Sequence, residues 1–232
     1  MIRTGLEFVP KLGMITIGQA PRTDVAPFLL KQLEGRAELV QAGVLDGWGL
    51  EAIEAELSPI GSSYMLTSRL ADGQAVVVAR DKIMPLLQRK IAELEAQGIR
   101  HILLLCTGVF PGLQAASAHL IEPDRVLTPA VAALAGNRRL GVICPLPGQA
   151  AALQAKFAEY GIKPVFAAAS PYTGNWQDFA AAAKELKGRA DVLLLDCMGY
   201  TEGHRNWVTA LSGLPTILSS SLMSKLVSEV IA

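Results

Sequence analysis

Apolar runs alternate with amphipathic helical patterns along most of the chain, and this alternation predicts the fold class. Apolar runs expected to form strands lie at residues 11–18, 37–45, 99–106, 138–145, 163–170, 190–197 and 214–220. Patterns with a helical period lie at residues 23–33, 49–57, 81–98, 148–161, 176–188 and 221–232. Strands that alternate with helices in this way favour parallel sheets covered by helices.

Residues 64–80 depart from this alternation. Asp72-Gly73 separates two short extended runs there, and an Asp-Gly pair in that setting indicates a tight turn between antiparallel strands. We therefore expect a β-hairpin, followed by a helix that Asp81 caps and Gly98 ends.

The two halves of the chain echo each other. The segment at 11–19 resembles the one at 139–149, and the segment at 99–108 resembles the one at 189–199. The two pairs have unequal offsets, which indicates an insertion in the first half, and the hairpin accounts for it.

This repeat predicts an α/β protein of two pseudo-symmetric lobes with parallel sheets. The first lobe is expected to comprise residues 1–128 plus 212–232, and the second residues 129–211. The chain would cross between the lobes twice, so we expect the lobes to close over a ligand in the cleft between them.

Composition narrows the classes of function. Hydrophobic residues make up 51% of the 232 residues and aromatic residues only 6%, as expected for covered sheets. The 21 basic and 21 acidic side chains balance, so neither nucleic acid nor an anionic membrane is expected as a partner. No apolar run reaches the roughly 18–20 residues of a membrane helix, and residues 1–18 lack the apolar core of a signal peptide. We therefore expect a cytoplasmic protein with reduced thiols.

Two of the three cysteines occupy matching places in the repeat. Cys106 ends an apolar run in RHILLLCTGVF and precedes Gly108, and Cys197 in ADVLLLDCMGY precedes Gly199 in the same way. Ligands bind beyond the carboxyl ends of parallel strands, so both thiols are expected to face the cleft. Glycine lets backbone N–H groups approach an anion, and a helix beginning just after would lower the thiol pKa toward neutrality.

Two such cysteines suit acid–base catalysis. One thiolate would take a proton from a carbon next to a carboxylate, and the other thiol would deliver a proton to the opposite face, without a cofactor. The alternative is that both are small buried hydrophobic residues, as free cysteines often are. Cys144, which lies among apolar residues and precedes Pro145, is expected to be such a buried thiol. Asp196 would raise the pKa of Cys197 unless its carboxylate points away.

These motifs also resemble a known family. LLLDCMGY looks like the second-cysteine motif of the aspartate/glutamate/hydantoin racemase superfamily, with Asp196 and Met198 in place of its Gly and Ala, and LLLCTG looks like the first-cysteine motif. Over nearly the whole chain, MITIGQAPRTDVAP, IEPDRVLTPAVAAL, RLGVICP and LLLDCMGY…HR resemble the AroM-like proteins. The resemblance implies two α/β lobes that each supply one catalytic cysteine, Cys106 and Cys197. It also implies a racemase or isomerase of a small carboxylate such as an amino acid or a hydantoin.

Residues of the first lobe are expected to hold that carboxylate. The loop IGQAPRTD carries Gln19 and Arg22 and resembles the loop that helps to hold the substrate in the racemases. Arg22 would pair with a carboxylate through two hydrogen bonds, or else lie at the surface beside a helix that Thr23 or Asp24 caps. Thr107 and the N–H groups around Gly108 would also hydrogen-bond to the carboxylate.

The second lobe is expected to contribute a matching set. Met198, Gly199 and Tyr200 would bind the carboxylate there, although Tyr200 also fits a plain packing role. Tyr172 would lie at the rim of the cleft, or else in a polar turn. His204 is a candidate for tuning Cys197, because glutamate-racemase-like relatives place a histidine close behind the second cysteine; it also fits an exposed helix start.

Other classes of site have no support in the sequence. The three histidines are too widely spaced for a zinc site, no nucleotide-binding glycine loop occurs, and neither metal nor cofactor is expected. Two alternatives stay open: a decarboxylase or isomerase that uses one cysteine, and a non-catalytic protein that binds a small metabolite. A homodimer is one expected assembly, because dimers are common in the resembled superfamily.

Overall fold

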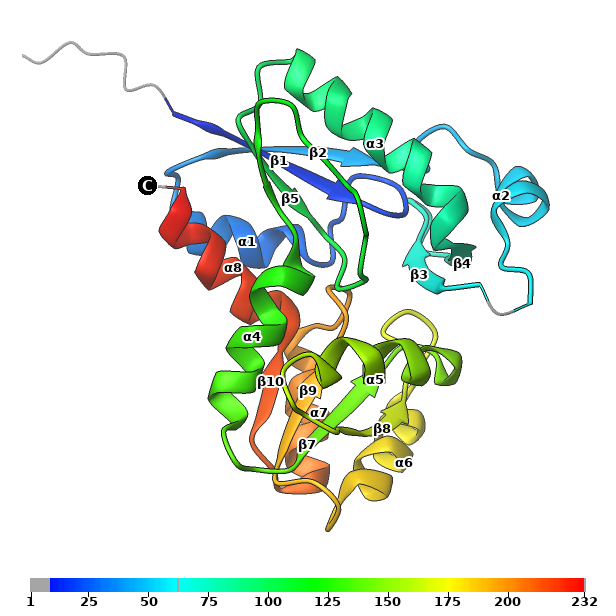
Figure 1. The fold of residues 1–232 in the computed structure, drawn as a ribbon, viewed down its shortest axis with the longest axis vertical. Coiled ribbons are helices and arrows are strands. Elements are labelled where there is room, and N and C mark those ends of the chain that lie inside the picture. Colours follow the sequence, from blue (N-terminus) through cyan, green and yellow to red (C-terminus); the bar gives the residue numbers. More distant parts are fainter. Residues whose placement is uncertain (1–8, 62, 232) are drawn as a thin grey trace, which may run out of the picture.

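The computed structural model describes residues 9–61 and 63–231, which form two lobes, one above the other in Figure 1. The first lobe holds a parallel sheet in the order β2-β1-β5-β6, with β1 (Lys11–Thr16), β2 (Glu38–Gly43), β5 (His101–Leu104) and β6 (His119–Ile121). The second holds a parallel sheet in the order β10-β9-β7-β8, with β7 (Leu140–Cys144), β8 (Val165–Ala168), β9 (Val192–Leu195) and β10 (Thr216–Leu218). The two sheets repeat one topology, with β1 matching β7 and β5 matching β9, as the internal repeat predicts.

Helices cover both faces of each sheet, which is why the strands read as almost continuous apolar runs. In the first lobe, α1 (Ala26–Leu33) and α8 (Ser219–Val230) pack on one face, and α2 (Leu50–Leu57) and α3 (Arg80–Ala96) on the other. In the second lobe, α6 (Trp176–Leu186) and α7 (Glu202–Ser212) share one buried cluster, and α4 (Pro123–Ala135) and α5 (Ala150–Ala158) another. Among the described residues, no helix is both long enough and apolar enough to cross a membrane.

The predicted hairpin is confirmed. Strands β3 (Met65–Arg69) and β4 (Ala75–Ala79) pair antiparallel, with Met65 opposite Ala79 and Arg69 opposite Ala75. Gly73 in the turn has a φ of 95°, a value that glycine adopts without strain. Alternate residues of β3 are buried, so one face of the hairpin packs against the core of the first lobe.

Two details of the predicted division into domains differ from the structure. The boundary drawn at residues 128 and 129 lies inside α4, which leads from β6 of the first sheet to β7 of the second. The tail from residue 212 does not belong wholly to the first lobe, because β10 pairs with β9 in the second sheet. Only α8 returns to the first lobe, where it packs against α1 (Figure 1). The division into domains as such stays a prediction.

Candidate active site

Cys106 and Cys197 line the same small cavity between the lobes. The cavity measures about 30 Å³ and is lined by Tyr64, Leu66, Thr67, Cys106, Thr107, Gly108, Pro145, Gln149, Leu153, Asp196 and Cys197. These residues come from the hairpin and from the loops after β5, β7 and β9. The others come from the short 3₁₀ turn before α5 and from α5 itself. Thr107 and Gly108, predicted to bind substrate, therefore do face this cavity.

The matching positions of the two cysteines follow from strand register. The amide of Leu105, just past β5, donates to the carbonyl of Ile15 in β1 at 2.7 Å. The amide of Asp196, just past β9, donates to the carbonyl of Ile143 in β7 at 3.0 Å. The next residue in each lobe is the cysteine, so each thiol stands at the carboxyl end of an inner strand, where parallel sheets place their ligands.

Each cysteine makes the same local contact. The amide of Gly108 donates to Cys106 Sγ at 3.4 Å, and the amide of Gly199 donates to Cys197 Sγ at 3.4 Å. A backbone N–H aimed at sulfur favours the thiolate over the thiol. The sequence repeat thus has a counterpart in the hydrogen bonding of the two sulfur atoms.

The expectation of a lowered thiol pKa is wrong for both cysteines at rest. Burial raises the pKa of Cys106 to about 12, and the Gly108 amide and Lys156 offset only part of this rise. Burial also raises the pKa of Cys197, against the opposing effects of the Gly199 amide and Arg22. No helix begins directly after either cysteine to supply the expected dipole, since α7 starts only at Glu202 and the next element after Cys106 is β6.

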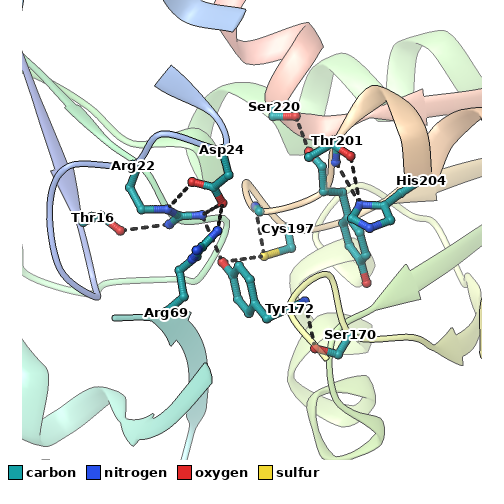
Figure 2. A network of polar contacts seen from close by, with 12 residues as sticks. Thr16, Arg22, Asp24, Arg69, Ser170, Tyr172, Cys197, Thr201, His204 and Ser220 are labelled. Carbon is teal, nitrogen blue, oxygen red and sulfur yellow. Dashed lines mark hydrogen bonds and ion pairs between the residues drawn. The ribbon is translucent and has the colours of Figure 1, made fainter. Parts of the chain in front are cut away.

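Tyr172 links Cys197 to the first lobe, as Figure 2 shows. Its hydroxyl lies 4.0 Å from Cys197 Sγ, and Arg22 Nη2 donates to the same hydroxyl at 3.5 Å. Tyr172 follows β8 in the second lobe, whereas Arg22 follows β1 in the first. A chain of polar contacts therefore runs from one lobe through Tyr172 to the thiol of the other.

Arg22 is buried, and Asp24 holds its guanidinium. Arg22 Nε and Nη2 donate to the two Asp24 oxygens at 2.8 and 2.7 Å, and Nη1 donates to Thr16 Oγ1 at 3.1 Å. Burial would raise the pKa of Asp24, but the paired Arg22 outweighs this effect and lowers the pKa below its usual value. Asp24 is thus neither a helix cap nor a free acid, and it occupies one of the two donor pairs through which Arg22 could hold a substrate carboxylate.

Gln19 fastens loops of the first lobe. Its side-chain amide donates to the carbonyls of Leu45 and Trp48 at 3.0 and 2.9 Å, and its oxygen accepts from the amide of Ala71 at 2.9 Å. These contacts occupy the side chain, and Gln19 does not belong to the cavity lining. The structure therefore gives Gln19 a role in holding loops together, in place of the expected contact with the carboxylate.

Four candidates of the second lobe have side chains outside the cavity lining: Tyr172, Met198, Tyr200 and His204. Met198 is buried among the residues that α1 and α8 cover, and the Tyr200 hydroxyl donates to the carbonyl of Ala169 at 2.6 Å in the core. His204 accepts from the amide of Thr201 at 3.1 Å and stacks on Phe179 with ring centroids 4.8 Å apart. Tyr200 thus has the packing role, and His204 fixes the start of α7 and contacts aromatic rings.

Cys144 matches its expected role as a buried thiol. Its side chain is 1% exposed, and Sγ donates to the carbonyls of Leu146 and Ala167 at 3.4 and 3.5 Å. It lies outside the lining of the cysteine cavity. Within residues 9–61 and 63–231, no three His, Cys, Asp or Glu side chains are grouped so as to hold a metal ion.

Sequence reasoning missed the partner of Asp196. The Asp196 carboxylate lies 3.3 Å from Lys156 Nζ, and both side chains are almost fully buried. Lys156 falls on the same helical stripe as Leu153, next to Phe157, so a charged residue among apolar positions was the available signal. The sequence also did not place the hairpin at the cavity, where Tyr64, Leu66 and Thr67 form one wall.

Comparison with solved structures supports a shared fold. Glutamate racemase from Aquifex pyrophilus superposes with a TM-score of 0.62 at 16% identity, covering 96% of this chain and 84% of that one. Picrophilus torridus aspartate racemase gives 0.58 at 13% identity, with 96% and 94% covered, and unliganded arylmalonate decarboxylase gives 0.54 at 15%, with 96% and 92% covered. At these identities the likeness shows the fold, which is the two-lobed fold of the aspartate/glutamate racemases.

Sequence comparison identifies the family. No curated protein matches the chain by sequence. The family model described as AroM protein matches residues 12–231, which is nearly the whole chain. The chain therefore belongs to the AroM protein family.

Proposed function

We propose that this protein is a cofactor-independent racemase or isomerase of a small carboxylate, with Cys106 and Cys197 as its acid/base pair. One observation carries the proposal: the two cysteines come from equivalent strand ends of two similar lobes and line one cavity, each with a backbone amide on its sulfur. The names of the structural neighbours, which are racemases of glutamate and aspartate and a decarboxylase of arylmalonate, agree with a small carboxylate as substrate.

In the proposed reaction, one cysteine acts as a thiolate and the other as a thiol. The thiolate removes a proton from the carbon next to the carboxylate, and the thiol on the opposite face of the substrate protonates that carbon. Burial raises the pKa of both thiols, which makes each a stronger base once it is ionised. The backbone amides of Gly108 and Gly199 would hold the negative charge on whichever sulfur is ionised.

Hydrogen exchange from solvent tests the proposal directly. Amino acids, hydroxy acids and hydantoins are incubated with the protein in D₂O, and deuterium at the carbon next to the carboxyl or carbonyl group is followed by NMR. We expect exchange with at least one class, and loss of racemisation in both Cys106→Ser and Cys197→Ser. Cys144→Ser is the matched control, because Cys144 lies outside the cavity, and it should keep the activity.

Other outcomes would contradict the two-cysteine reaction. Ligand-induced stabilisation without any exchange would favour a protein that only binds a metabolite. Activity that survives Cys106→Ser but not Cys197→Ser would favour a decarboxylase or isomerase with one cysteine. One observation supports this second candidate: it is the sulfur of Cys197 that lies near the Tyr172 hydroxyl, to which Arg22 donates.

A further inference from the structure

A lysine is buried beside the cysteine cavity, and its contacts span both lobes. The Lys156 side chain on α5 is only 3% exposed. Its Nζ donates to the carbonyl of Thr107 in the first lobe at 3.0 Å. It also lies 3.3 Å from Asp196 Oδ2 and 3.5 Å from Asp124 Oδ1. Lysine is rarely buried without carboxylate partners, and here two carboxylates and a carbonyl surround the ammonium group.

Both ends of this network lead to a proposed catalytic cysteine. Asp196 directly precedes Cys197, and Thr107 directly follows Cys106. The Thr107 hydroxyl also donates to the carbonyl of Asp196 at 3.3 Å, so the two cysteine loops contact each other across the lobes. Lys156 therefore holds both loops from the side of α5.

The negative charge of Asp196 affects the ionisation of both thiols. A carboxylate near a thiol opposes its ionisation, and Asp196 raises the pKa of Cys106 and of Cys197. Lys156 acts in the opposite direction and lowers the pKa of Cys106.

The other groups around the thiols belong to different elements. Cys197 raises the pKa of Cys106, and burial together with the nearby Cys106 raises the pKa of Tyr64, at the start of the hairpin. Arg22 and Tyr172 lower the pKa of Cys197. Burial, Asp196 and Cys197 raise the pKa of Cys144. The Asp196 carboxylate forms its ion pair with Lys156, at 3.3 Å.

We propose that Lys156 is a positioning residue for the two cysteines. Lys156 neutralises the Asp196 carboxylate beside Cys197 and fixes the Cys106 loop through the carbonyl of Thr107. The inference rests on the proposed function, since it assigns Lys156 a part in preparing the proposed acid/base pair. It explains why this sequence tolerates an aspartate next to a cysteine that has to ionise.

A double-mutant cycle tests the proposal without any substrate. The rate of alkylation by iodoacetamide is measured for Cys106 and Cys197 separately, by mass spectrometry of their peptides, from pH 7 to 9.5. Lys156→Met, Asp196→Asn and the double variant are compared with the unaltered protein. Lys163→Met is the control, because Lys163 is exposed and lies outside the cavity lining.

The comparison of the single with the double variant isolates the charge. Lys156→Met and the double variant both lack the contact with Thr107, so any gain in access of the reagent is common to both. Only Lys156→Met leaves Asp196 without its partner, so Cys106 should be alkylated about tenfold faster in the double variant, which corresponds to about one pKa unit. Asp196→Asn should have a much smaller effect while Lys156 is present.

Two results would overturn the proposal. One is that Asp196→Asn changes the alkylation rates by the same factor with and without Lys156. The other is that folded Lys156→Met gives the same pH profile as Lys163→Met. Should Lys156→Met fail to fold, the double variant, which has no unpaired carboxylate at residue 196, still has to fold, and an alkylation profile identical to that of Asp196→Asn would show that the contact with Thr107 does not fix the Cys106 loop. Since the readout is thiol reactivity, the proposed reaction and this inference can fail independently.

Discussion

At Gly199 the backbone of the second lobe passes so close to Tyr172 that no side chain fits between them. A Cβ atom built on Gly199 would lie 2.6 Å from Tyr172 Cζ, well inside van der Waals contact. The same backbone segment donates its amide to Cys197 Sγ. The lack of space beside Tyr172 therefore requires a glycine here, whether or not a substrate also approaches the backbone.

Gly199→Ala should destabilise the protein by about 1–3 kcal/mol, the usual cost of overpacking, because the ring of Tyr172 occupies the space that the new methyl group needs. Urea unfolding measures the change. Gly203→Ala is the control, since Gly203 is exposed in α7 and its Cβ would meet nothing closer than Thr201 Oγ1 at 3.5 Å. A free energy of unfolding that is the same for the two variants would show that Tyr172 yields at little cost.

The cysteine pair could be predicted from the sequence, but most of the residues that surround it could not. Each cysteine ends an apolar run before a glycine, and parallel sheets bring such strand ends to one edge. The pairing of Asp24 with Arg22, or of Lys156 with Asp196, depends on which side chains meet after the chain has folded. No spacing along the chain encodes these contacts, so the sequence predicts a cap at Asp24 and indicates no partner for Asp196.

Among the elements, α3 fixes the long loop between β5 and β6 through Glu95 near its C-terminal end. The Glu95 carboxylate accepts from the amides of Ala116, Ser117 and Ala118, which lie just before β6. These amides lower the pKa of Glu95 to about 2, from a usual value of 4.5. The loop that this carboxylate holds follows the Cys106 segment, so Glu95 helps to fix the chain beyond the cavity.

Glu95→Gln should lower stability at neutral pH, and the loss should disappear in acid. The folded-state pKa is lower than the unfolded one, so the stabilisation by Glu95 is present above pH 4.5 and is lost as the pH falls toward 2. Urea unfolding of both proteins between pH 7 and 2 tests this. Glu93→Gln, an exposed position on the same helix, is the control; a pH-independent difference for Glu95→Gln would contradict the assignment.

Elements with a strong local sequence pattern are predicted, and elements with a weak pattern are not. The hairpin turn at Asp72-Gly73 and the long stripe of α3 are marked in the sequence, and both were found. The three-residue strand β6 is too short to show a period, and α4 contains Pro129, which suggested a boundary where the helix continues. Tertiary packing forms these elements, because β6 completes a sheet and α4 is buried against α5 and α8.

In the whole molecule, side chains of both lobes surround a small cavity. The cavity measures about 30 Å³, so we expect the lobes to separate when a carboxylate substrate enters. The contacts that have to yield include Arg22 with Tyr172 and Lys156 with Thr107. Gln149 adds another, because its Nε2 donates to the carbonyl of Met65 in the hairpin at 3.2 Å.

Gln149→Ala should therefore make the lobes open more often and expose both cysteines to small reagents. A net hydrogen bond of about 1 kcal/mol corresponds to a roughly fivefold increase in the open fraction. Alkylation of Cys106 and Cys197 should accelerate by this same factor at every pH, because access changes and the thiol pKa does not. Gln88→Ala is a close control, since Gln88 also joins its amide to a carbonyl, that of Gln114, but within the first lobe. Acceleration of one cysteine alone, or an equal effect of Gln88→Ala, would show that the contact between Gln149 and the hairpin does not control opening.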